Sequence, residues 1–120
     1  MDYKEWAFHD VSPVYLQLYE KLTHSILNGQ LCPCEDIPPI QQMAAMLKIS
    51  SSTVVRAYQL VNQQKLIVRS NRQRYKVTPD VLFIQQKRNE VGKTLRFTYI
   101  HQMLELEYTK EEILAFINEY

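Results

Sequence analysis

The residues with the clearest chemistry are basic side chains that gather in one part of the chain. Residues 37–79 carry seven basic side chains and no acidic one, whereas residues 1–36 carry two basic and six acidic side chains and residues 80–120 carry five and seven. A long stretch without carboxylates is typical of a surface that binds a polyanion. The alternative is a solvated face without a partner. The seven residues are Lys48, Arg56, Lys65, Arg69, Arg72, Arg74 and Lys76.

Small hydroxyl side chains precede Arg56 at a predicted helix start. Ser51, Ser52 and Thr53 carry short donors and acceptors that can reach the phosphates or base edges of duplex DNA. Arg56 follows about one turn later, where a guanidinium can pair with guanine or with a phosphate. The structural alternatives are a serine that only caps the helix and an arginine held in an intramolecular pair.

Further polar residues flank this segment. Gln41 is a candidate for a backbone contact, with a solvated side chain as an equal alternative. The basic residues of a predicted hairpin are candidates for phosphate clamps or for probes of the minor groove, and the alternative is a solvated hairpin tip. These candidates are Arg69, Arg72, Arg74 and Lys76.

Metal binding and catalysis find little support in the residue pattern. Cys32 and Cys34 are separated by one residue and the three histidines are scattered, whereas a four-ligand zinc site needs more Cys or His close by, at C-x2-4-C spacing. We interpret the cysteines as two small apolar side chains in a turn. Nucleophile, phosphate-loop and zinc-protease motifs do not occur in the sequence. We therefore expect no enzyme, no metal and no cofactor.

Helical periodicity predicts the elements that position the candidate residues. A helix over 13–28 has an apolar stripe at spacing four, and Gly29 is placed to end it. Residues 31–39 have three prolines and predict a loop. Two short helices follow, over 40–47 and from about residue 52 to 64, with apolar residues at i, i+3, i+4 and i+7. Two such helices joined by a short turn predict a helix-turn-helix.

The rest of the chain predicts a hairpin and a helical tail. Strands over 66–68 and 75–78 would enclose a basic wing over 69–74. Thr78-Pro79-Asp80 indicates a helix start with a threonine cap and proline in the first turn, leading to a long helix that ends near Tyr108, with Gly92 marking a kink or break. Residues 109–112 form a T-x-x-E capping box before a last helix.

Residues 13–78 resemble the winged-helix domain of GntR-type regulators, and the short tail is most similar to that of the YtrA-like subfamily. The run 53–58 carries the most specific part of the match. Three turn positions that are glycine in the family are Cys34, Lys48 and Lys65 here, so we expect these turns to differ in detail. The matching residues are Gly29, Leu31, Pro33, Ile37, Pro38, Met43, Ala44, Leu47, Thr53, Val54, Arg56, Ala57, Tyr58, Leu66 and Ile67.

Two more departures affect the candidate site. Gln41 stands where the family carries a basic residue, which removes one expected contact with DNA. The wing tip over 71–74 lacks the glycines that the family uses to enter the minor groove.

The predicted fold is therefore mainly α with a small β-hairpin. A winged helix-turn-helix over 1–79 is followed by a helical dimerisation tail over 80–120. The tail has more large apolar residues than one small domain can cover, which favours a homodimer; the alternative is a tail folded back on the helix over 13–28. The predicted interface residues are Ile84, Val91, Leu95, Tyr99, Met103, Leu106, Ile113 and Ile117.

These features predict a regulator of transcription that binds duplex DNA sequence-specifically. The resemblance implies a repressor that acts as a homodimer on an inverted repeat. An adaptor that has lost DNA binding is the main alternative, and a single-strand or RNA binder is disfavoured because the aromatic residues fall at core spacing. A small effector of unknown identity is left open. No apolar run approaches the roughly 18 residues of a membrane span, so we expect a cytoplasmic protein without a membrane partner.

Overall fold

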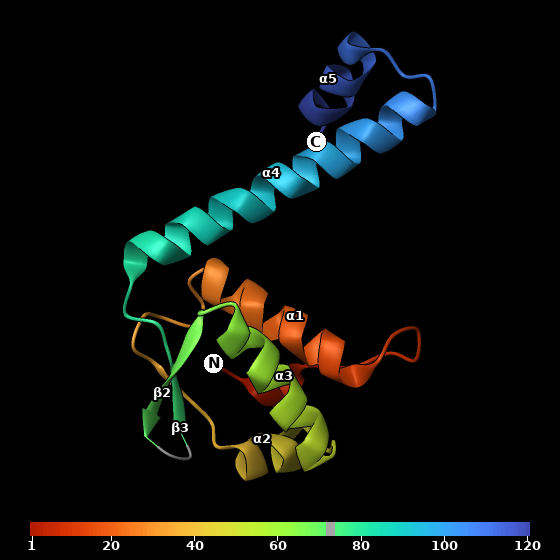
Figure 1. The fold of residues 1–120 in the computed structure, drawn as a ribbon. Helices are drawn as coiled ribbons and strands as arrows, with labels where there is room; N and C mark the ends of the chain where they lie inside the picture. Colours follow the sequence, from red (N-terminus) through yellow and green to blue (C-terminus); the bar gives the residue numbers. More distant parts are fainter. Residues whose placement is uncertain (72–73) are drawn as a thin grey trace. The chain divides into compact units, whose positions relative to one another are not determined.

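The computed structural model of the chain describes residues 1–71 and 74–120 (Figure 1). Internal contacts divide the chain into two compact units, Met1–Gln85 and Gln86–Tyr120. The sequence predicted a boundary after residue 79. In the structure the next few residues stay with the first unit, where Ile84 is buried. None of the helices in the described ranges combines the length and the apolar composition that a membrane span needs.

Three helices form the core of the first unit. α1 (Val14–Leu27) and α2 (Ile40–Leu47) both pack on α3 (Ser51–Gln63) (Figure 1). The apolar stripes predicted from helical spacing are confirmed except at Ile40, the first member of the α2 stripe, which is only half-buried. The buried residues are Leu18, Leu22, Ile26, Met43, Ala44, Leu47, Val54, Ala57, Tyr58 and Val61.

The turn between α2 and α3 sets where α3 begins. Lys48 ends α2 in the left-handed conformation, with φ 57°, and the hydroxyl of Ser50 accepts the Thr53 N–H at 3.2 Å as the cap of α3. Cys34 and Lys65 are also left-handed, with φ of 68° and 63°. The expected change in these turns is therefore wrong: the backbone keeps the conformation that glycine favours, although a side chain there costs about 1–2 kcal/mol.

A three-stranded antiparallel sheet in the order β1-β3-β2 completes this unit. β2 (Ile67–Asn71) extends further than predicted, and β3 (Arg74–Val77) follows it. The prediction that 31–39 is only a loop is wrong, because β1 (Asp36–Ile37) lies within it. β1 pairs with β3, and the Val77 N–H donates to the Glu35 carbonyl at 2.8 Å. Pairing with β3 thus gives hydrogen-bond partners to backbone N–H and C=O groups of this proline-containing segment.

The tail contains α4 (Val81–Glu105) and α5 (Lys110–Asn118). Asp80, not Thr78, caps α4, since its carboxylate accepts the Phe83 N–H at 3.1 Å; Pro79 therefore precedes the helix. α4 continues through Gly92 without the predicted break and ends before Tyr108. The capping box of α5 is confirmed, with the hydroxyl of Thr109 accepting the Glu112 N–H at 3.2 Å.

Two tyrosines in the first unit are buried in a way that makes folding sensitive to alkaline pH. Tyr3, in a short 3-10 helix (Tyr3–Glu5) that the sequence did not predict, is buried. Burial, with a smaller effect of the nearby Glu35 carboxylate, raises the pKa of Tyr3 to about 12. Burial also raises the pKa of Tyr58, whose hydroxyl donates to the Pro38 carbonyl at 2.7 Å.

We therefore expect the free energy of unfolding to fall above pH 10. Between pH 10 and 12 the unfolded chain loses tyrosine protons that the folded chain retains, so the stability present below pH 10 is lost as the pH rises. For Tyr3 the loss between pH 8 and pH 11.5 is about 2 kcal/mol. Urea unfolding at pH 8 and pH 11.5 measures it. Tyr3→Phe should lose less stability than the parent over this range; an equal loss would contradict the assignment.

Candidate nucleic-acid interface

The first turn of α3 presents the predicted hydroxyl side chains. Ser52 is exposed, and Ser51 and Thr53 are half-buried. The hydroxyl of Ser50 lies 2.7 Å from the Thr53 hydroxyl and 3.2 Å from the Ser52 hydroxyl. Thr53 therefore belongs to the capping network, whereas Ser52 lies at its exposed edge and is the better placed of the two to reach a base or a phosphate.

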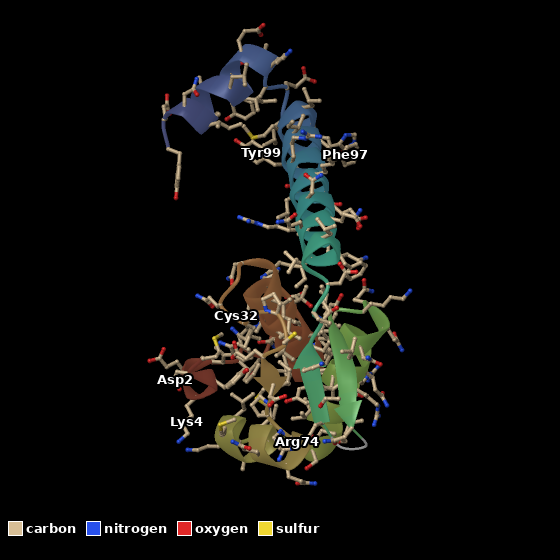
Figure 2. All side chains as sticks on the ribbon, turned by 90° about the vertical axis from the view of Figure 1, so that its left-hand side faces the viewer. Asp2, Lys4, Cys32, Arg74, Phe97 and Tyr99 are labelled. Atoms are coloured by element: carbon tan, nitrogen blue, oxygen red, sulfur yellow. The ribbon has the colours of Figure 1, made fainter. Side chains whose placement is uncertain are left out.

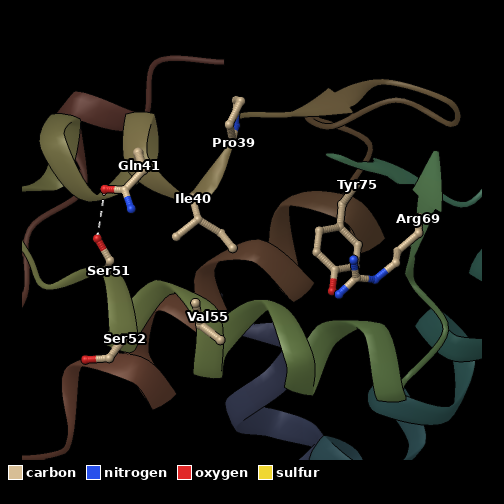
Figure 3. Close-up of a pocket in the computed structure, with 8 residues that line it drawn as sticks. All are labelled: Pro39, Ile40, Gln41, Ser51, Ser52, Val55, Arg69 and Tyr75. Carbon is tan, nitrogen blue, oxygen red and sulfur yellow. Dashed lines mark hydrogen bonds between the residues drawn. The ribbon is translucent and has the colours of Figure 1, made fainter. Parts of the chain in front are cut away.

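Gln41 and Ser51 form a direct link between α2 and α3. The Ser51 hydroxyl donates to Gln41 Oε1 at 3.0 Å (Figure 3). Because an amide oxygen and an amide nitrogen have opposite hydrogen-bonding roles, this contact leaves the Gln41 NH₂ group available as a donor. The structure thus brings together two predicted site residues that lie ten positions apart in the sequence.

A cavity of about 420 Å³ lies between these helices and the sheet. Its polar wall includes Gln41, Ser51 and Ser52, and Arg69 and Tyr75 come from the strands (Figure 3). Its remaining lining is apolar and comes from the start of α2 and from α3: Pro39, Ile40 and Val55. From the sequence, Pro39 was expected at the entry to the helix over 40–47 and Ile40 in its apolar stripe, and no role was expected for Val55, an apolar residue outside the stripe of α3.

Arg56 is exposed but its guanidinium rests on another side chain. The guanidinium carbon lies 3.7 Å from the ring centroid of Tyr15 in α1. This is the geometry of a cation–π contact. The alternative of an intramolecular pair is thus present in the structure, and it leaves the edges of the guanidinium free to donate because stacking uses only its face.

The basic residues of the hairpin occupy different surroundings. The Arg69 guanidinium lies 5.0 Å from the Tyr75 ring centroid. Arg74 is exposed at the start of β3 (Figure 2). Lys76 is half-buried and stands opposite Asp36 in the β1–β3 ladder. Arg72 lies outside the described residues.

The cysteine turn carries two thiols on the surface. Cys32 and Cys34 are free and exposed, and the Glu35 N–H donates to the Cys32 carbonyl at 3.0 Å, which closes the predicted turn. Over residues 1–71 and 74–120, no three His, Cys, Asp or Glu side chains form a group that could hold a metal ion.

The predicted dimerisation residues differ in exposure. Ile84 and Ile113 are buried within the chain, so they are not available to a partner. Leu95 and Tyr99 are four residues apart in α4, and the side chains of Tyr99 and Phe97 project from different sides of this helix (Figure 2). Phe97, which the predicted interface residues did not include, is also exposed. The predicted residues that remain exposed or half-buried are Val91, Leu95, Tyr99, Met103, Leu106 and Ile117.

Comparison with known proteins decides the family. The model of the bacterial regulatory proteins of the gntR family matches residues 14–77, which is more than half of the chain. The chain belongs to the GntR family. This GntR-family chain is 22% identical over 113 residues to the HTH-type transcriptional regulator YhcF of Bacillus subtilis, covering 94% of the chain and 93% of YhcF.

Solved structures agree with this GntR assignment. A GntR family transcriptional regulator from Listeria monocytogenes superposes with a TM-score of 0.85 at 25% identity, over 94% of this chain and 99% of that one. YtrA from Sulfolobus acidocaldarius, a GntR-family transcription factor, superposes with a TM-score of 0.57 at 27% identity, over 96% and 93%. The predicted winged helix-turn-helix with C-terminal helices is confirmed, as is the family. GntR-family regulators are DNA-binding proteins without enzymatic activity, so this chain is a DNA-binding regulator.

Proposed function

We propose that the protein is a homodimeric repressor that binds an inverted-repeat operator through α3. The observation that carries this proposal is the first turn of α3, where Ser52 and the Gln41–Ser51 pair border a cavity. These residues belong to the segment 37–79, which contains no carboxylate. A helix of this kind enters the major groove with its first residues toward the bases. Arg69 and Arg74 then supply contacts with phosphates, and Arg56, one turn further along α3, pairs with a guanine.

The tail supports the homodimer. Leu95 is 64% exposed, Phe97 68% and Leu106 69%, and a monomer would leave these large apolar side chains in water. Two copies related by a two-fold axis present the same surface to each other and cover it. A two-fold dimer places two copies of α3 in opposite orientation, which calls for half-sites about 10 base pairs apart.

The proposed mode of action is repression, because a DNA-binding unit with a dimerisation tail can block a promoter by occupying it. Residues 86–120 are too few to enclose a pocket of several hundred Å³, so we expect a small effector to bind this unit weakly or at a subunit interface. Because DNA is the target, the proposal includes a cytoplasmic location.

The salt dependence of affinity tests DNA binding. If the basic surface neutralises Z phosphates, log affinity falls with log salt concentration at a slope near −0.9Z. We expect a steep fall for the parent, and a slope shallower by about one for Arg74→Gln, because that residue contacts a phosphate in the proposal. Fluorescence titration of labelled duplexes measures both slopes. An affinity that does not change with salt would contradict the proposal and favour the adaptor alternative.

A further inference from the structure

We propose that the cavity between α2 and α3 reads the edge of a thymine in the major groove. This inference rests on the proposed function, because it assigns a base to the reading surface of that same site. Two chemical features of the cavity carry it: a hydrogen-bond donor held in a fixed direction, and an apolar wall beside it.

The donor is the amide nitrogen of Gln41. A glutamine amide can present either its oxygen or its nitrogen, and so can recognise donors or acceptors. Here the Ser51 hydroxyl donates to Oε1 at 3.0 Å (Figure 3), which engages the oxygen and leaves the NH₂ group to a ligand. Gln41 is exposed, so this donor is accessible. Ser51 therefore orients the amide so that its nitrogen lies on the side away from the Ser51 hydroxyl (Figure 3).

The apolar wall is formed by Val55 and Ile40. Val55 follows Ser51 by one turn of α3, so the two side chains share a face of the helix. Both Val55 and Ile40 are half-buried and line the same cavity as Gln41 and Ser51 (Figure 3). These apolar side chains cannot form a hydrogen bond with a base, but they can pack against a methyl group.

Thymine matches this pair of features. In the major groove, thymine presents the acceptor O4 next to the C5 methyl group, guanine presents two acceptors, adenine an acceptor and a donor, and cytosine a donor. An amide donor beside an apolar wall complements O4 and the methyl group together.

The other bases call for residues that this part of the cavity lacks. Guanine is read best by an arginine fork, and Arg69, the cation among the lining residues, lies by Tyr75 on the strands. Cytosine is read by a carboxylate, and residues 37–79 contain none. Adenine has no methyl group at its major-groove edge, so it would leave the apolar wall of Val55 and Ile40 without a partner.

The first test changes only the DNA. Bound duplexes are selected from random sequence, and each thymine of the selected site is replaced by deoxyuridine, which keeps O4 and lacks the methyl group. We expect one position in each half-site where the replacement weakens binding by about fourfold, the effect of one buried methyl group. Tolerance of deoxyuridine at every thymine, or a selected site without a fixed thymine, would overturn the inference.

The second test assigns the contact to the side chains. Val55→Ala should remove the sensitivity to deoxyuridine at that position, whereas Val11→Ala, at an exposed residue outside the cavity, should keep it. Gln41→Glu should shift the preference at the same position from thymine to cytosine, because its carboxylate accepts from the cytosine amino group. Val55→Ala with unchanged sensitivity would overturn the assignment. Melting temperatures of the variants show that each is folded.

These outcomes separate the two proposals. If the parent selects no sequence and binds without salt dependence, the proposed function fails. If the parent selects a site but tolerates deoxyuridine throughout, the proposed function stands and the thymine contact fails.

Discussion

A chain that ends after Gln85 is expected to be a monomer and to bind its operator at least about 100-fold more weakly than the full chain. The cut follows the contact boundary, so it keeps Ile84, which is buried in the first unit. Each monomer then binds one half-site without the high effective concentration that a linked second unit provides, and that gain is about 10²–10⁴ in affinity. Sedimentation measures the mass, and titration of a full operator measures the affinity.

A full-length variant separates loss of the dimer from loss of the tail. Leu95→Glu and Phe97→Glu place two charges on exposed positions of α4, where they oppose an apolar interface but leave the first unit unchanged. We expect this double variant to behave as the shortened chain does. Affinity for a single half-site should be the same for the parent and both variants. If the shortened chain remains a dimer and binds the operator as well as the parent, the tail is not the dimerisation element.

The elements whose side chains repeat at helical spacing could be predicted from the sequence. α1, α2 and α3 lie where their apolar stripes placed them, and the capping box before α5 is formed. Such features depend on residues a few positions apart, so a local pattern contains the information.

The features that the sequence could not predict depend on partners far along the chain. β1 has two residues, too few to show alternation, and exists through its pairing with β3. Tyr3 is buried by tertiary packing of a segment without periodicity.

The candidate site shows the same division. The residue types of α3 indicated DNA binding, but the Gln41–Ser51 hydrogen bond and the Arg56–Tyr15 contact join different helices and required the fold. The apolar side of the cavity was missed because an isolated valine or isoleucine is by default a core residue.

Arg56→Ala is expected to weaken specific binding by about 1–3 kcal/mol. The Tyr15 ring holds the guanidinium by its face at 3.7 Å, so the side chain is ordered before DNA arrives and loses less entropy on binding. Lys110→Ala, at an exposed residue of α5 in the tail, serves as the charge-matched control and should change affinity little. Titration of the selected operator at one salt concentration gives each value, and the melting temperatures report on folding.

The role of Tyr15 in this effect can be measured with a double-mutant cycle. Tyr15→Phe keeps the ring and should keep the affinity, whereas Tyr15→Leu removes the ring and should lose about 0.5–1 kcal/mol of binding. In the Arg56→Ala background, Tyr15→Leu should have no further effect, because the side chain that the ring orders is absent. Equal losses from Arg56→Ala and Lys110→Ala would show that α3 does not present Arg56 to DNA. Full additivity of the two changes would show instead that Tyr15 acts independently of Arg56.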